Sequence, residues 1–221
     1  MLRTKILLNS KNQSQKHGFL FENEIRSKVF KLDTVSNDTK KYDIDCKENI
    51  YNPNENISIK TTGSNNIDCG DILRFFNRDI DIKTTMIIGF YRQVNQYIKQ
   101  IIDIVEVDYN DKLHRILFGD ITLDEISKYV ASVKSIPIGK VTNKDYIAVK
   151  NDLQKKYNMY IRISPKVDSK NQRRVQCSIP KIQELLKMYP ELIINRTIDG
   201  VLIVRGIQID GKISSQRRKR Q

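Results

Sequence analysis

The chain has 221 residues and a formal net charge of +13 at pH 7, with 39% hydrophobic and 29% charged residues. This length suits one large domain or a core with a small appendage, and the apolar content is adequate for a packed interior. The positive charge favours an anionic partner, most often nucleic acid, and a merely solvated basic surface is the alternative.

The cysteine and hydropathy patterns argue against several classes of protein. Three cysteines are widely spaced without a CxxC pair and only two histidines occur, so a structural zinc site is not expected. No stretch approaches the roughly 18 apolar residues of a membrane span, and the N-terminal apolar run is too short for a signal peptide. We therefore expect a soluble intracellular protein with no membrane partner, either cytoplasmic or, in a eukaryotic host, nuclear.

The basic charge is concentrated towards the end of the chain. Residues 1–150 carry 23 basic and 20 acidic side chains, whereas residues 151–221 carry 16 and 6. A nearly balanced front with acidic clusters fits a metal site, and a basic back fits contacts with phosphates.

The first predicted element is a helix that begins near Ser14 or His17 and ends at about Val29. Phe21, Ile25 and Val29 recur four residues apart and form an apolar stripe along it. This stripe predicts a helix that packs one face against a core.

Two short strands are predicted next, joined by a polar turn that contains a proline. Residues 41–47 alternate so that Asp43 and Asp45 share one strand face, and the second strand ends at Lys60. Strands joined in this way should pair antiparallel, which would place Asp43 near Lys60.

The rest of the chain alternates between helical and strand patterns. The predicted elements are a helix at 68–77 capped by Asp68, a buried central strand at 84–91, a strand at 100–107, helices at 122–133 and 144–157, a strand at 159–164, a basic loop at 165–174, a strand at 175–179, a helix at 180–188 and a strand at 201–209. This order predicts an α/β fold with a mixed central β-sheet flanked by helices, followed by a basic C-terminal extension.

An acid–acid–lysine pattern lies in the front half. Glu22 follows an aromatic residue on the first helix, Asp43 lies on the first strand, and Ser58-Ile59-Lys60 ends the second strand after 14 intervening residues. This arrangement resembles the PD-(D/E)XK nuclease superfamily, the fold of most type II restriction endonucleases. The resemblance covers roughly residues 17–92 and implies a restriction-endonuclease-like core, Mg²⁺-dependent hydrolysis of DNA and a homodimer with one active site per strand.

The resemblance also implies a role for each residue. Asp43 and Glu22 would bind Mg²⁺, and Lys60 would orient or deprotonate the attacking water and offset negative charge. Ser58 stands where the family usually has an acidic residue, so metal binding would also use the carbonyl of Ile59. Asp45 could add a carboxylate through water.

Two choices of metal ligand are left open by the residues themselves. Asp43 is favoured over Asp45 because it begins the strand, and Glu22 over Glu24 because of the aromatic-then-glutamate order. An ordinary surface carboxylate is the alternative for each.

Two segments are predicted to contact DNA. The loop after Lys60 offers short polar side chains to the backbone or the minor groove: Thr61, Thr62, Ser64, Asn65 and Asn66. The basic segment 164–178 mixes groups that bind phosphates with groups that pair with base edges: Lys170, Asn171, Gln172, Arg173, Arg174 and Gln176. A solvated basic hairpin is the alternative for the second segment.

The sequence thus predicts a Mg²⁺-dependent endodeoxyribonuclease that cleaves double-stranded DNA at specific sites, in the manner of a type II restriction enzyme. Residues 1–140 would form the catalytic core and residues 141–221 the DNA-recognition region. A noncatalytic nucleic-acid-binding protein on a degenerate nuclease fold is one alternative, because Ser58 is a weak metal ligand. A homing, repair or junction-resolving nuclease is the other.

Overall fold

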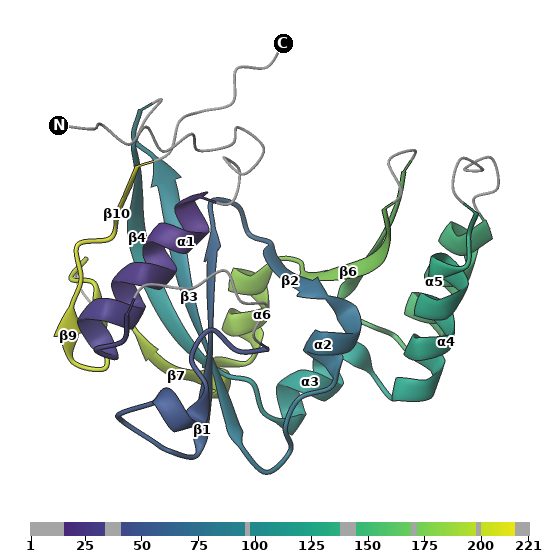
Figure 1. Cartoon of the computed structure of the whole chain (residues 1–221), viewed down its shortest axis with the longest axis horizontal. Helices are drawn as coiled ribbons and strands as arrows, with labels where there is room; N and C mark the ends of the chain where they lie inside the picture. The colour runs from purple at the N-terminus through teal and green to yellow at the C-terminus, as the bar shows by residue number, and fades with distance from the viewer. Residues whose placement is uncertain are drawn as a thin grey trace, which may run out of the picture.

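The computed structural model describes residues 16–33, 41–95, 98–137, 145–168, 172–197 and 200–214, to which every structural statement refers. They form a mixed α/β fold in which helices flank a curled mixed sheet and a smaller antiparallel sheet (Figure 1). The predicted mixed sheet flanked by helices is therefore confirmed, whereas a separate basic C-terminal extension is not shown.

The helices are short. Their bounds are α1 Lys16–Glu24, α2 Ile72–Phe76, α3 Asp111–Phe118, α4 Leu123–Lys134, α5 Asp145–Lys156 and α6 Ile182–Met188. A π-helical turn at Ile25–Val29 extends α1, and 3₁₀ turns lie at Cys46–Glu48 and Pro190–Leu192.

The larger sheet has the order β1–β3–β4–β10, and β7 also pairs with β4. Its strands are β1 Glu55–Thr62, β3 Lys83–Gln93, β4 Ile98–Asp108, β7 Ile193–Arg196 and β10 Lys212–Ser214. β1 is parallel to β3, whereas β4 is antiparallel to β3, β7 and β10. β1 therefore lies at one edge of the larger sheet.

The smaller sheet is antiparallel with the order β2–β6–β5. Its strands are β2 Ile67–Asp71, β6 Arg173–Ile179 and β5 Arg162–Val167. A separate two-stranded hairpin consists of β8 Ile203–Val204 and β9 Ile207–Gln208.

Strand β3 separates two hydrophobic cores. Met86 and Ile88 lie in a core with α3, α4 and the smaller sheet, whereas Ile87 lies in a core with α1. Both faces of β3 are therefore buried, which explains the continuous apolar run in its sequence. Gly89 permits the close approach of α1, because a Cβ at that position would lie 2.9 Å from the ring of Phe21.

Most predicted elements are present. The helix that ends at Val29, the central strand, the strand at 100–107 and the helices at 122–133 and 144–157 all occur within a few residues of the expected bounds. α4 begins as its sequence implies, because Thr122 and Glu125 form a reciprocal capping box. The apolar stripe of Phe21, Ile25 and Val29 is fully buried, as predicted.

Four local predictions are wrong. The strand at 41–47 is reduced to one antiparallel bridge between Ile44 and Ile57, because Asp45 already caps the 3₁₀ turn. The helix at 68–77 is a strand followed by a short helix whose cap is Asp71 rather than Asp68. The basic loop predicted at 165–174 includes the end of β5, to Val167, and the start of β6, from Arg173, and the strand predicted at 201–209 is a hairpin that turns at Arg205.

The proposed boundary at residue 140 does not separate the sheets. β7 and β10 complete the larger sheet, and β6 pairs with β2 in the smaller sheet. Residues after 140 are therefore built into both sheets, and the division of labour at that boundary stays a prediction about function.

Candidate active site

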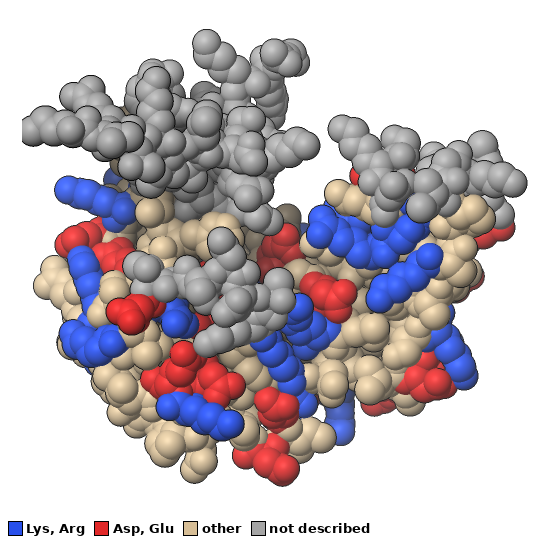
Figure 2. All heavy atoms as spheres, viewed as in Figure 1, with Lys and Arg blue, Asp and Glu red and all other residues tan. Residues whose placement is uncertain are grey.

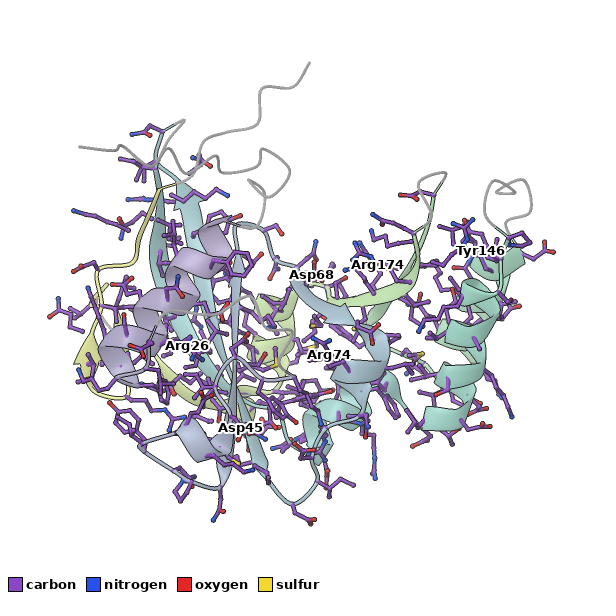
Figure 3. The ribbon with its side chains drawn as sticks, viewed as in Figure 1. Arg26, Asp45, Asp68, Arg74, Tyr146 and Arg174 are labelled. Atoms are coloured by element: carbon purple, nitrogen blue, oxygen red, sulfur yellow. The ribbon has the colours of Figure 1, made fainter. Side chains whose placement is uncertain are left out.

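A cavity of about 450 Å³ opens beside the edge strand β1. Its walls come from α1, the segment before the 3₁₀ turn, the strands β1, β2 and β3, the helix α2, one residue of β6, and the residues Arg78 and Tyr109. The charged side chains that line it are balanced in sign: Glu22, Asp43, Asp68 and Asp71, with Lys41, Lys60, Arg74 and Arg78. Figure 3 labels Asp68 and Arg74 on β2 and α2.

The predicted pair of Asp43 and Lys60 is in direct contact. Asp43 Oδ2 accepts a hydrogen bond from Lys60 Nζ at 3.2 Å, from the backbone N–H of Ile59 at 2.5 Å and from Ser58 Oγ at 3.4 Å. No described residue donates to the other carboxylate oxygen, Oδ1. The pair therefore fixes the orientation of the carboxylate and leaves one oxygen for a ligand.

The alternation of β1 explains how this pair forms. Ile57 and Ile59 are buried in the core with α1, so Ser58 and Lys60 point to the opposite face. The bridge between Ile44 and Ile57 then brings Asp43 alongside. The expected proximity of Asp43 and Lys60 is thus confirmed, although one bridge rather than a full strand produces it.

Arg26 holds the backbone of the aspartate segment. This arginine is 92% buried, and its guanidinium donates to the carbonyls of Asp43 and Asp33. Sequence reasoning did not single out Arg26. Its spacing of four residues from Glu22, on the same helix face, is the signal that could have revealed it.

Glu22 faces the same cavity from α1. Burial, together with the negative charge of Asp43, raises the pKa of Glu22 to about 7. No described residue forms a hydrogen bond or an ion pair with its carboxylate. A partly desolvated carboxylate without a partner is costly for a folded chain, and such groups concentrate at functional sites.

Lys60 is charged at neutral pH. Burial lowers its pKa, but the charge of Asp43 and the hydrogen bond between them outweigh burial and raise the pKa above its usual value. Lys60 also donates to the carbonyl of Ile59 at 3.1 Å. In this arrangement the lysine supplies a fixed positive charge rather than a base.

The two alternative ligands are engaged elsewhere. Asp45, labelled in Figure 3, accepts from the backbone N–H of Lys47 as a helix cap and does not line the cavity. Glu24 binds Lys28 and accepts from the backbone N–H groups of Asp210 and Gly211, so it anchors the C-terminal segment. The geometry therefore favours Asp43 and Glu22 over these two.

The cavity offers few side-chain ligands for a metal ion. Within the described ranges, no group of three or more His, Cys, Asp or Glu side chains is arranged to hold one. Four carboxylates nevertheless line the cavity, and two of them, those of Glu22 and Asp43, interact electrostatically with each other. Mg²⁺ is often held by only one or two carboxylates, with water and phosphate oxygens as its other ligands. The two carboxylates fit this pattern, because a bound cation would offset the burial and the repulsion by Asp43 that raise the pKa of Glu22.

The loop after β1 is used mainly for structure. Thr62 is buried and its hydroxyl bonds Ser64 and Asn66, which fixes the turn. Asn65 and Asn66 accept from backbone N–H groups at the start of α6, including that of Gln183 at 2.8 Å. Of the predicted DNA contacts in this loop, Thr61 alone lines the cavity.

In the basic segment 164–178, too, some of the predicted DNA contacts have structural roles and others are exposed. Arg173 donates to four backbone carbonyls, among them those of Ile136 and Pro137 at 2.8 Å, so its guanidinium clamps the hairpin to the segment that follows α4. Arg174 and Gln172 are exposed, and Gln176 lines the cavity. Lys170 and Asn171 lie outside the described residues.

Two further findings bear on the partners of this chain. None of the described helices combines the length and the apolar character that crossing a bilayer requires. A comparison of the chain with models of protein families, with curated proteins and with solved structures finds no match.

Proposed function

We propose that this protein is a divalent-cation-dependent endodeoxyribonuclease that hydrolyses phosphodiester bonds of double-stranded DNA, in the manner of type II restriction endonucleases. The observation that carries the proposal is the contact between Asp43 and Lys60 in a cavity that Glu22 also lines. Hydrolysis of a phosphodiester needs a positioned water and positive charge beside the phosphoryl oxygens. The cavity supplies groups for both.

Mg²⁺ is the proposed cofactor, held by Glu22 and by the Oδ1 oxygen of Asp43. When bound, the ion would polarise the phosphate and lower the pKa of a bound water. The carbonyl of Ile59 is a less favourable ligand than the sequence suggests, because it already accepts from Lys60.

Lys60 would act on the phosphate through its charge. Its raised pKa keeps the ammonium protonated at neutral pH, so it can offset negative charge as the phosphorus–oxygen bond breaks. Asp43 holds the ammonium within 3.2 Å and thereby orients it. Of the two roles that the sequence suggests for Lys60, this supports orientation and charge neutralisation rather than removal of a proton from water.

The test is cleavage of plasmid DNA by the purified chain with Mg²⁺, where we expect discrete fragments that EDTA abolishes. The Lys60→Ala protein, purified in the same way, controls for a contaminating nuclease. Discrete fragments from an intact plasmid favour a restriction role, and preference for branched or nicked DNA favours a repair or junction-resolving role. Full cleavage in EDTA, or equal cleavage by the Lys60→Ala protein, would overturn the proposal.

A noncatalytic nucleic-acid-binding protein on a nuclease-like fold is the second candidate. One observation favours it: Ser58, which stands in the position of the usual carboxylate, donates to Asp43 at 3.4 Å rather than adding a negative charge. Duplex binding without cleavage in Mg²⁺ or Mn²⁺, on plasmid and branched substrates, would support this candidate over the nuclease.

Gel filtration with light scattering, in the presence and absence of a DNA duplex, tests the proposed homodimer. Two active sites acting on opposite strands would require that assembly, because the cavity of one chain contains one set of Glu22, Asp43 and Lys60. A monomer that still cuts both strands at one site would contradict it.

A further inference from the structure

The strands β5 and β6 expose one polar, basic face. In their antiparallel register the opposed pairs on this face are Arg162 with Ser178, Ser164 with Gln176, and Lys166 with Arg174. The three basic side chains are exposed, and the other three are partly exposed. Residues opposed in a register share a face of the sheet, so these six form one continuous surface, the β5–β6 outer face.

The opposite face of the same strands is buried. Ile163, Val175 and Cys177 alternate with the outer-face residues and lie in the core with α3 and α4. Because one face is committed to the core, the register cannot slip by one residue without burying Arg174. The outer face is therefore a fixed array of side chains rather than a variable hairpin surface.

The six side chains are free to bind a ligand. None of them forms a hydrogen bond or an ion pair with another described residue through its side chain. Figure 2 shows Lys and Arg side chains gathered over the region where Figure 3 labels Arg174. By contrast, the neighbouring Arg173 uses its guanidinium to bind backbone carbonyls. This contrast separates binding positions from structural ones within one basic segment.

This face is continuous with the candidate active site. Gln176 belongs to both the outer face and the cavity wall. Asp68 and Asp71 of β2 pair with Ser178 and Gln176 and also line the cavity. Neighbouring strands lie about 4.8 Å apart, so β5 is only about 10 Å from the cavity edge at β2.

We propose that the β5–β6 outer face docks double-stranded DNA beside the cavity, with Arg162, Lys166 and Arg174 on phosphates and Gln176 at a base edge. This inference rests on the proposed nuclease function and adds Arg162, Ser164, Lys166 and Ser178 to its binding surface.

The chemistry of the face favours DNA over an acidic protein. A two-stranded ribbon fits the major groove, which is about 12 Å wide. The amide of Gln176 and the hydroxyls of Ser164 and Ser178 provide acceptors as well as donors, which base edges require and carboxylates do not. The acidic residues of the same face, Asp68 and Asp71, lie on β2, so the phosphates would contact the three basic side chains of β5 and β6.

The test compares two triple variants of equal net charge. The face variant is R162Q/K166Q/R174Q, and the control variant is R115Q/K128Q/K134Q, whose exposed positions lie on α3 and α4, away from the outer face. Circular dichroism and thermal unfolding establish that both fold. Binding of a 30-base-pair duplex is measured by fluorescence anisotropy in EDTA, so that no cleavage occurs, at several salt concentrations.

For the face variant we expect the slope of log affinity against log salt concentration to be shallower by roughly 2.7, about 0.9 for each lost phosphate contact. Its affinity for the duplex should be lower by on the order of 10²-fold near 0.1 M salt. The control variant should bind like the unchanged protein. Equal slopes for the two variants would overturn the proposal. Failure of the unchanged protein to bind the duplex, or tighter binding of polyglutamate or single-stranded DNA, would also overturn it.

The two proposals fail in different ways. If the face variant alone loses duplex binding while the unchanged protein never cleaves DNA with Mg²⁺, the docking face holds and the nuclease function falls. If the unchanged protein cleaves DNA but both variants bind with the same salt dependence, the nuclease function holds and the docking face falls.

Discussion

A glutamate lies near each end of β1, and the surroundings of the two shift their pKa values in opposite directions. At its start, Glu55 is fully buried and accepts from Thr85, from Asn49 at 3.3 Å and from Arg205 at 2.8 Å. Burial alone would raise the pKa of Glu55, but the hydrogen bonds from Thr85 and Arg205 outweigh it and lower the pKa. Near the other end, Glu22 lies beside Lys60 and Asp43 with no such partners, and its pKa is raised to about 7.

The difference separates a structural charge from a functional one. Arg205 bridges Glu55 and Glu106, with its Nε 2.9 Å from Glu106, and thereby ties the β8–β9 hairpin to the larger sheet. Lys83 Nζ also lies 3.8 Å from Glu55, so the cluster has two cations for its two carboxylates. At the cavity end, the carboxylate of Glu22 has no hydrogen-bond or ion-pair partner among the described residues, which costs stability unless a ligand supplies a cation.

Removing the arginine of the compensated cluster should have the largest effect on stability. Arg205→Met leaves Glu55 and Glu106 buried without their shared cation, so we expect a loss of about 3–5 kcal/mol in the free energy of unfolding. Urea unfolding at pH 7 measures it. The matched control is Arg196→Met, whose exposed pair with Asp103 should contribute about 0–1 kcal/mol. Equal losses for the two variants would show that the Arg205 cluster is not a structural clamp.

Changes at the cavity end should affect activity rather than folding. Lys60→Ala and Asp43→Asn should each reduce the single-turnover cleavage rate at least about 10²-fold, or about 2.7 kcal/mol, because each removes a charge that acts on the reacting phosphate. Duplex binding measured in EDTA should persist. Wild-type cleavage rates for both variants would place the active site elsewhere in the molecule.

The charge on Glu22 should make the metal-free protein less stable as pH rises. The pKa of Glu22 in the folded state, about 7, exceeds the usual 4.5. Between these two pH values the folded state therefore keeps a proton that the unfolded chain has lost. Stability should therefore fall through this window, by about 1–3 kcal/mol in urea titrations with EDTA, and stay level above it.

Two controls sharpen this pH prediction. Glu22→Gln should remove the contribution, and Mg²⁺ should partly restore stability at pH 8 because it binds the folded state alone. Glu24→Gln should instead lower the stability by a similar amount below and above the pH window of Glu22, since Glu24 anchors the segment at Asp210 and Gly211. A pH profile of Glu22→Gln identical to that of the unchanged protein would contradict the assignment.

The smallest effect is expected at Asp45. Asp45→Ala removes the cap of a 3₁₀ turn, which should cost about 1 kcal/mol in unfolding free energy and leave the cleavage rate unchanged. Comparison with Asp43→Asn at the same Mg²⁺ concentration discriminates between the two aspartates. A loss of cleavage confined to Asp45→Ala would move the metal ligand two residues along the chain.

Local patterns predicted much of the fold. Helical spacing of Phe21, Ile25 and Val29 identified a packed face that continues from α1 into its π-helical extension. The predictions failed where side chains compete for backbone groups. Asp45 caps a turn rather than continuing a strand, because a short carboxylate can bond backbone N–H groups two residues on.

The candidate site was predictable in part for the same reason. Asp43, Ser58 and Lys60 come together because a strand alternation and one antiparallel bridge are short-range consequences of sequence. The clamp formed by Arg173 was not predictable, since its acceptors lie in the segment that follows α4, 36 and 37 residues away in sequence. The sequence does not distinguish Arg173 from its neighbour Arg174, and the fold determines which of the two faces solvent.

The sequence by itself determined which chemistry is available: an acid–acid–lysine set, a basic surplus and the periodicities that form the helices and strands. The tertiary structure alone decided which charges are neutralised inside the protein and which are left for a ligand. Glu55, Glu24 and Glu22 are the same residue type in sequence, yet only Glu22 lines the cavity without a partner among the described residues. The physical reason is that the cost of a buried charge depends on its neighbours in space, and long-range packing sets those neighbours.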